Sequence, residues 1–285
     1  MSSVDQFESV FRSAVKDVYH YKPVKIESVL LITDQTEENS AKIKQQLQQF
    51  SPQLSTNSIQ WHLSIGETPK TTEALLQEAE AIKPDLICSY RNLYSNAWQF
   101  PHSLGEHLDV LLQRTAIPVL VIPHPKASYA SEHALTKSTS VMVVTDHLTL
   151  DHDLVHNAVA FTAPGGSLHL SHIEDEVYFK RIIKAISKIA TINTDDAEEK
   201  LARQLLKEPH DFISSCPPAL AEANINLNVI EHVKFGHHIK DYKSLIEEYE
   251  LDLLVMNTKD EDQLAMHGLA YPLAIELRHI PLLML

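Results

Sequence analysis

Apolar residues recur along the chain in two alternating patterns, short continuous runs and longer segments at helical spacing. Continuous runs are typical of buried strands, because a strand in a parallel sheet is covered on both faces. In the first part of the chain such runs or alternating stretches lie at 28–33, 58–65, 85–89 and 118–122. Segments with apolar residues every three or four positions separate them, at 39–50, 75–82 and 104–112. Strands alternating with helices of this length predict parallel pairing through right-handed crossovers, and therefore an α/β fold.

The same alternation begins again after residue 137. Run 141–146 matches 29–34, and the last run, 281–285, matches 118–122. Because the blocks recur in the same order, the pattern predicts a duplication. We expect two tandem, doubly wound parallel-sheet domains of Rossmann-like type. Domain one is expected at 24–125, a Pro-containing linker at 126–137 and domain two at 138–285.

Two segments fall outside this repeat. Residues 1–23 form an expected N-terminal helix, with one apolar stripe made by Phe7, Val10, Phe11, Ala14, Val15 and Val18. Segment 174–223 has no counterpart in the first domain, which is one strand–helix unit short. Its pattern predicts a helical insertion with a helix through 177–189, a second after the acidic stretch 195–199 and a third that starts at Pro209.

The charge balance limits the kinds of partner. Acidic residues outnumber basic ones 38 to 24, which gives a formal net charge of −14 and argues against nucleic acid or anionic lipid surfaces as partners. No apolar run approaches the roughly 20 residues that span a bilayer. The first residues lack the apolar region of a secretory signal. Cys88 and Cys216 are too few for a disulfide framework and are expected to be reduced thiols. We therefore expect a cytoplasmic protein.

Taken together, these blocks resemble the universal stress protein family in a tandem two-domain form. Thr-Asp pairs end the first strands at 33–34 and 145–146, and Gly66 and Gly236 stand where the family has a glycine before a helix. Runs 85–89 and 252–257 match its fourth strand. The resemblance implies that the last strands, 118–122 and 281–285, pair as in the family's dimers. It thus implies a pseudo-dimer within one chain, with a homo-oligomer as a further option.

Nucleotide-binding members of that family carry Gly-X-X-Gly, nine residues and then Gly-Ser or Gly-Thr after the fourth strand. Bare glycine backbone lets amide groups close on phosphate oxygens. In domain two these positions hold Asn257, Asp260, Ala270 and Tyr271. In domain one they hold Ser89, Asn92, His102 and Ser103, with Arg91 nearby. Neither domain keeps the phosphate loop, so we expect no cofactor. ATP or AMP in a modified pose in domain one is the alternative.

Three residues of this region have two interpretations each. Asp34 and Asp146 end the first strands, where the resemblance implies a contact with adenosine. The other interpretation, which we favour, is that each caps the helix that follows. Ser103 could likewise bind an anion or cap its helix, and capping is favoured.

Histidine is abundant, with 17 residues, and suggests a further alternative. His152 and His156 are spaced to share one helix face, and with Asp146 they are candidates for a metal site or a proton-sensitive cluster. No tight ligand motif supports a metal, so we expect none. His169 and His172 should point to opposite faces of a strand.

The sequence contains no nucleophile elbow, complete P-loop or paired-carboxylate motif, and it predicts a protein that is not an enzyme. The leading hypothesis is a stress-response or regulatory protein that binds a protein partner or small-molecule ligand and has lost standard ATP binding. Two alternatives stay open: a nucleotide-binding protein with a modified site in domain one, and a metal- or pH-responsive module that uses the domain-two histidines.

Overall fold

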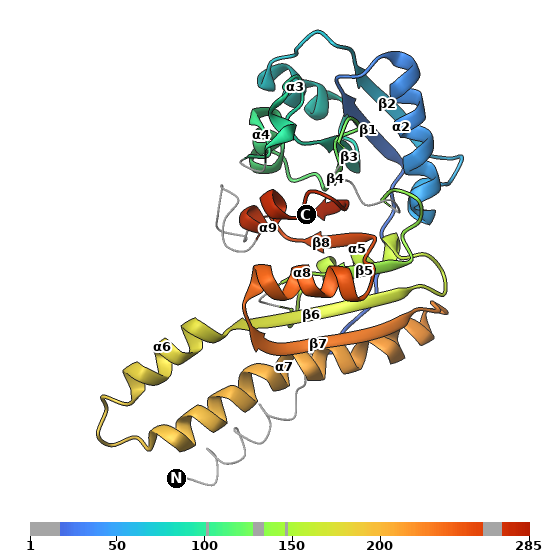
Figure 1. Cartoon of the computed structure of the whole chain (residues 1–285). Coiled ribbons are helices and arrows are strands. Elements are labelled where there is room, and N and C mark those ends of the chain that lie inside the picture. The colour runs from blue at the N-terminus through green and yellow to red at the C-terminus, as the bar shows by residue number, and fades with distance from the viewer. Residues whose placement is uncertain (1–17, 101–102, 128–133, 146–147, 259–269) are drawn as a thin grey trace.

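One nine-stranded sheet runs through the whole molecule, and helices cover it (Figure 1). The computed structural model describes residues 18–100, 103–127, 134–145, 148–258 and 270–285. The strand order is β2-β1-β3-β4-β9-β8-β5-β6-β7. The fold is therefore α/β with a largely parallel sheet, as the alternating pattern predicted.

The first half of the sheet contains four parallel strands. They are β1 (Ser28–Thr33), β2 (Gln60–Ile65), β3 (Leu86–Tyr90) and β4 (Val119–Ile122). Helices α2 (Glu37–Phe50), α3 (Thr72–Ile82) and α4 (Glu106–Arg114) connect them, with short 3-10 turns at Pro52–Leu54 and Ala97–Gln99. All residues of β3 and β4 are buried, because these strands lie inside the sheet.

The second half contains five parallel strands. They are β5 (Ser140–Val143), β6 (Ser167–Asp175), β7 (Asn228–Gly236), β8 (Leu253–Met256) and β9 (Leu282–Met284). The helices are α5 (His152–Phe161), α6 (Glu176–Ile186), α7 (Thr194–Glu222), α8 (His238–Glu248) and α9 (Ala270–Glu276). The extra strand is β7, and the segment that leads to it contains α6 and α7.

The two halves join through their last strands. β4 pairs antiparallel with β9, with Leu120 opposite Leu283, as expected for runs 118–122 and 281–285. All other strand pairs described are parallel. An antiparallel junction reverses the strand direction, so the carboxyl ends of the two halves lie at opposite edges of the sheet.

Helices α7 and α8 cover opposite faces of β6 and β7. On β7, Glu231 accepts hydrogen bonds from His210 of α7, at 2.8 and 2.9 Å, whereas the ring of His232 contacts Tyr249, which follows α8. Neighbouring residues of a strand point to opposite faces, which assigns one helix to each face. None of the helices in the described ranges is both long enough and apolar enough to cross a bilayer.

The segment between β6 and β7 forms an arm. Helix α6 and the first half of α7 project beyond the sheet (Figure 1). The prediction that a third helix starts at Pro209 is wrong: α7 runs without interruption from Thr194 to Glu222 and contains Pro209, Pro217 and Pro218. Proline removes one donor per position, and burial of Phe212, Ile213, Cys216 and Leu220 along the same helix holds it in place. The expected helix over 1–23 lies largely outside the described residues.

Candidate functional site

The carboxyl edge of the first half brings together several of the predicted site residues. Asp34 follows β1, Arg91 and Asn92 follow β3, and Ser103 lies just before α4. Ligands of open α/β sheets bind at this edge, outside the strand ends. The candidate site is therefore built from the loops after β1 and β3 and from the chain that enters α4.

Asp34 is held by three hydrogen bonds. Its carboxylate accepts the hydroxyl of Tyr90 at 2.6 Å, the backbone N–H of Tyr94 at 2.9 Å and the side-chain amide of Gln35. Burial raises the pKa of Asp34, but the bonds from Tyr90, Tyr94 and Gln35 outweigh it and keep the pKa below its ordinary value. Helix α2 is capped instead by Thr36, whose side chain accepts from the N–H of Asn39. The interpretation of Asp34 as a helix cap is wrong.

Tyr90 is the centre of this network and is fully buried. Its hydroxyl lies 2.8 Å from the Thr33 hydroxyl and accepts the N–H of Asp34 at 3.0 Å and the amide of Gln35 at 3.3 Å. The single proton of the Tyr90 hydroxyl is donated to the Asp34 carboxylate, so the Thr33 hydroxyl donates to the Tyr90 oxygen. Burial raises the pKa of Tyr90, and the hydrogen bond to Asp34 raises it further. The phenol therefore stays neutral and acts as a donor.

His124, just after β4, lies between two aromatic rings. It stacks on Trp98 with ring centroids 4.7 Å apart, and meets Tyr90 edge-on at 4.9 Å. Nδ1 accepts the backbone N–H of Lys126 at 3.2 Å. Burial lowers the pKa of His124 to about 4, so at neutral pH the ring is uncharged with its proton on Nε2. That buried N–H has no acceptor among the described residues.

The loop after β3 is closed against the entry to α4. Asn92 has a positive φ of 59°, its N–H donates to the carbonyl of Leu104 at 2.7 Å, and its side chain bonds both the carbonyl and the hydroxyl of Ser103. Gly105 precedes α4 with φ +89°, and no side chain caps this helix. The interpretation of Ser103 as a helix cap is wrong, because its hydroxyl bonds Asn92 instead.

Two further predicted residues serve the interior. The Ser89 hydroxyl, buried in β3, donates to the carbonyl of Ile32 at 3.1 Å. The guanidinium of Arg91 donates to the carbonyls of Ala274 at 2.5 Å and Ile275 at 3.1 Å, in the last turn of α9. Cations at this position satisfy carbonyls that a helix end leaves open. Arg91 thus links the two halves.

In the second half, Asn257 follows β8 and donates to the carboxylate of Asp151 at 2.6 Å. Asp151 also caps α5, and burial raises its pKa. Tyr271 is half-buried on α9; burial raises its pKa, and Asp109 of α4 adds to the shift. Asp146 and Asp260 lie outside the described residues.

The described histidines are spread over several contacts. The rings of His152 and His156 share one face of α5, with centroids 6.2 Å apart. His169 and His232 are bonded at 2.9 Å, whereas His172 bonds Glu174 at 2.9 Å. Within the described ranges, no group of three or more histidine, cysteine, aspartate or glutamate side chains could hold a metal ion.

Sequence reasoning missed the residues that organise the site: Tyr90, Gln35, Trp98 and His124. One signal was available for Tyr90. The apolar run of β3 ends in Ser-Tyr-Arg-Asn, a set of polar side chains where a buried parallel strand reaches its carboxyl edge. Trp98 and His124 are 26 positions apart in sequence, and nothing in the local pattern indicates that they stack.

Comparison with solved structures identifies the fold. Two chains match with a TM-score of 0.50 and 13% identity over 91% of this chain: a functionally unknown protein from Pseudomonas aeruginosa PAO1, covered over 92% of its length, and a candidate universal stress protein from P. aeruginosa UCBPP-PA14, covered over 93%. A universal stress protein from Archaeoglobus fulgidus matches with a TM-score of 0.45 and 13% identity, over 92% of this chain and 85% of that one. No protein-family model and no curated protein matches the sequence. The chain therefore has the Rossmann-like α/β fold of universal stress proteins.

Proposed function

We propose that the chain is a non-enzymatic stress-response or regulatory protein of the universal stress type that has lost standard ATP binding and acts through a protein partner or a small ligand. A cytoplasmic location belongs to the same proposal. The fold of the Pseudomonas aeruginosa neighbour supports the universal stress type. The contact between Asn92 and the chain at 103–105 is the observation that carries the loss of ATP binding.

A phosphate cradle needs free backbone N–H groups that converge on the anion. Here the N–H of Asn92 already donates to Leu104, and the amide and hydroxyl of Asn92 and Ser103 bond each other. A phosphate would have to displace these bonds. The cation nearest to the loop in sequence, Arg91, is engaged with the end of α9. In the described part of the first half, the polar groups of the site thus bond one another rather than a triphosphate.

A lack of catalysis is supported by the state of the thiols. Cys88 and Cys216 are both buried, and burial raises the pKa of each, that of Cys216 to about 12. A protonated, inaccessible thiol is a poor nucleophile. In the first half of the chain, Asp34 is ionised, but its carboxylate already accepts three hydrogen bonds. It therefore has little capacity to act as a general base.

Calorimetric titration of the full chain with ATP and with AMP, each with and without Mg²⁺, tests the proposal. We expect no heat of binding at nucleotide concentrations up to about 1 mM. A dissociation constant of about 1 mM corresponds to a binding free energy of only about 4 kcal/mol in magnitude. Micromolar affinity that disappears in Ser103→Ala would overturn it. Asn257→Ala is the matched control in the other half. Nucleotide binding that disappears in this variant would place the nucleotide in the second half and would also overturn the proposal.

One observation favours the nucleotide-binding alternative. Trp98 and His124 form a flat aromatic stack, and the N–H at Nε2 of His124 lacks an acceptor among the described residues. A planar heterocycle could use such a donor. Titration with adenosine, which has no phosphate, separates this case: binding of adenosine with loss in His124→Phe would favour the modified site. The metal alternative is tested by elemental analysis of untagged protein, where about one zinc per chain would support it.

A further inference from the structure

Exposed apolar side chains are concentrated on the arm formed by α6, the connection 187–193 and the first half of α7. Among the described residues, ten large apolar side chains are exposed, and six of them lie on this arm: Val177, Tyr178, Ile182, Ile189, Ile192 and Leu201. Exposed apolar residues scattered singly need no explanation, whereas a concentration on one projecting element marks an interaction surface. The arm projects from the body, so this surface is accessible to another molecule (Figure 1).

Helix α6 is apolar on two sides. Phe179 and Ile183 are buried on its inner side, and the ring of Phe179 lies 4.6 Å from that of Phe235 at the end of β7. Its outer side carries Tyr178, 61% exposed, and Ile182, 37% exposed, one helical turn apart. The contact with the body is therefore already made by the inner side. Ile189 and Ile192 in the connection are also exposed. These two residues together with Tyr178 and Ile182 are called the apolar strip below.

Charge is segregated along the same arm. Between 177 and 193 there are four basic residues and no acidic one; between 194 and 199 there are four acidic residues and no basic one. Some are paired within the arm: Lys180 bonds Glu176, and Asp196 bonds Lys200. Five other charged residues of the arm form no ion pair with any described residue. They are Arg181, Lys184 and Lys188 on the α6 side, and Asp195 and Glu198 on α7.

We propose that the arm binds the arm of a second copy of this chain. In a two-fold contact each interaction occurs twice, so a basic α6 beside an acidic α7 is complementary to itself when one arm is turned onto the other. The apolar strip would lie at the centre of the contact. A two-fold arrangement places the cations of one arm against the acids of its partner.

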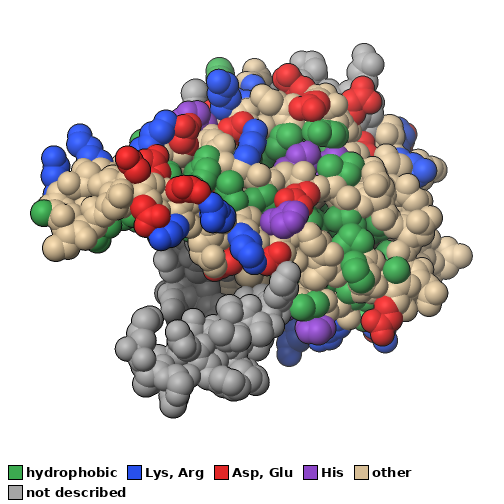
Figure 2. Space-filling model, turned by 90° about the horizontal axis from the view of Figure 1, so that it is seen from below, with side chains coloured by type: hydrophobic (Ala, Val, Ile, Leu, Met, Phe, Trp, Pro, Cys, Tyr) green, Lys and Arg blue, Asp and Glu red, His purple; other side chains and the backbone are tan. Residues whose placement is uncertain are grey.

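The overall charge favours the arm as the place of contact. Segment 176–208 holds seven basic and six acidic residues, whereas the whole chain has a net charge of −14. Two bodies so strongly acidic repel each other, and a nearly neutral projection lets two copies meet while the bodies stay apart. Figure 2 shows both Lys or Arg and Asp or Glu side chains on the projecting arm. An anionic lipid surface would be repelled by the acidic residues at the start of α7 and by the body.

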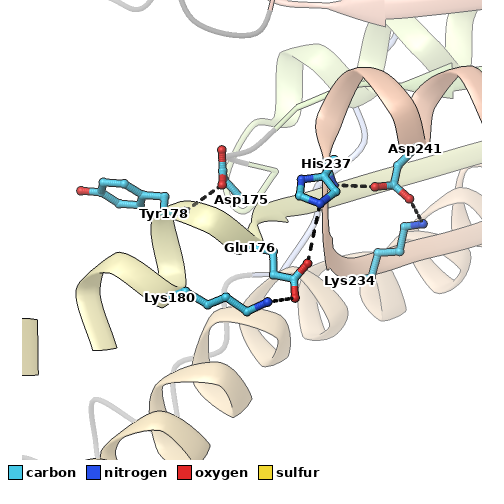
Figure 3. A network of polar contacts seen from close by, with 7 residues as sticks. All are labelled: Asp175, Glu176, Tyr178, Lys180, Lys234, His237 and Asp241. Atoms are coloured by element: carbon cyan, nitrogen blue, oxygen red, sulfur yellow. Dashed lines mark hydrogen bonds and ion pairs between the residues drawn. The ribbon is translucent and has the colours of Figure 1, made fainter. Parts of the chain in front are cut away.

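The root of the arm is fixed, which reduces the ordering cost of binding. Asp175 caps α6 by accepting the N–H of Tyr178 at 2.8 Å (Figure 3). Glu176 bonds Lys180 at 2.5 Å and lies 3.9 Å from His237, at the start of α8. Asp241 of α8 accepts the backbone N–H of His237 at 2.6 Å and bonds Lys234 at 2.5 Å. The arm thus leaves the body at a defined angle.

Sedimentation equilibrium of the full chain tests the pairing. We expect a dimer that dissociates in the micromolar range, and at least a tenfold weaker association for Tyr178→Ser combined with Ile182→Ser, since these exposed positions do not hold the fold. Leu63→Ser is the matched control: Leu63 is 42% exposed on edge strand β2, and its loss should leave the dimer unchanged. Equal weakening by Leu63→Ser overturns the proposal. So does a chain that is monomeric at about 100 µM, including one that binds anionic phospholipid vesicles instead.

Charge exchange gives a second test that a general loss of folding cannot imitate. Chains with Lys184→Glu and Lys188→Glu, or with Asp195→Lys and Glu198→Lys, should each associate at least tenfold more weakly, because like charges then face each other. A mixture of the two should form a heterodimer with affinity close to that of the original dimer, since both contacts again join opposite charges. Two variants that remain monomeric when mixed, although each folds normally by circular dichroism, contradict the arm-to-arm arrangement.

Discussion

Gly105 lies against Asn92 so closely that a Cβ atom at position 105 would be 2.7 Å from the Cα of Asn92 and 2.8 Å from its N. Such distances are too short for any side chain, and the atoms met are backbone atoms that cannot move aside. This contact holds the loop after β3 against the start of α4. Gly105 therefore allows a close approach of two backbone segments that a residue with a Cβ atom would prevent.

The first prediction concerns this contact. Gly105→Ala should lower the free energy of unfolding by at least about 2 kcal/mol, because it combines a positive φ with a backbone clash. Urea denaturation measures it. Gly165→Ala is the matched control, since Gly165 also has a positive φ, 75°, but nothing within 4 Å of its Cβ position. In Gly165→Ala the free energy of unfolding should fall by only about 1 kcal/mol, the cost of placing a residue with a Cβ atom at a positive φ. Equal losses for both variants would show that the contact at Gly105 is not tight.

The second prediction concerns the hub at Tyr90. Tyr90→Phe removes the donor to Asp34 and the acceptor of Thr33 in a buried place. We expect the free energy of unfolding to fall by about 2 kcal/mol, the cost of leaving buried polar groups without partners. Tyr178→Phe, at an exposed position, should change it by less than about 0.5 kcal/mol. Loss of the hydrogen bond should also move the pKa of Asp34 upward, which carboxylate NMR can follow.

The third prediction concerns the link between the halves. Arg91→Met keeps the aliphatic bulk but removes the bonds to the carbonyls of Ala274 and Ile275. We expect a loss of about 2 kcal/mol and faster amide hydrogen exchange in α9. Arg114→Met, at an exposed position of α4, is the control and should leave the exchange of α9 unchanged. If α9 exchanges at the same rate in Arg91→Met, the guanidinium does not fix its end.

The fourth prediction is a pH dependence from two buried histidines. Burial lowers the pKa of His124 and of His169 from 6.5 to about 4, and neighbouring His232 adds to the shift of His169. Their unfolded forms take up protons near pH 6.5 and the folded forms do not. This contribution to stability is therefore full above pH 6.5 and is lost as the pH falls from 6.5 to about 4. Urea denaturation between pH 4 and 7.5 should show the decline.

NMR titration of the ring protons checks the same prediction directly. Signals of His124 and His169 that titrate near the ordinary histidine pKa of 6.5 would contradict the burial of both rings.

The order of the fold could be predicted from the sequence because it depends on local pattern. Buried runs such as Leu86–Tyr90 are continuous, and helices carry apolar stripes. The pairing of the last strands, by contrast, was implied by the resemblance to universal stress proteins. The prediction for Pro209 failed because it considered only the local effect of proline, which lacks a backbone N–H and disfavours a helix interior. The packing of Phe212 and Leu220 decides that the helix continues through this position.

The candidate site shows the limit of such reasoning. Sequence placed Asp34, Asn92 and Ser103 near one edge of the sheet, but not their partners. A short polar side chain at a strand end can cap a helix or bind another loop, and the choice depends on which group lies across the fold. For Asp34 that group is Tyr90, 56 positions away in sequence.

By itself the sequence determined the alternation of strands and helices, the repeated order of apolar runs in the two halves and the strand that the first half lacks, because residue types and their spacing carry this information. The tertiary structure alone decided that Asn92 closes on Gly105, that Arg91 holds α9 and that the charged arm projects from the body. These features depend on distances between segments far apart in the chain, which periodicity does not encode.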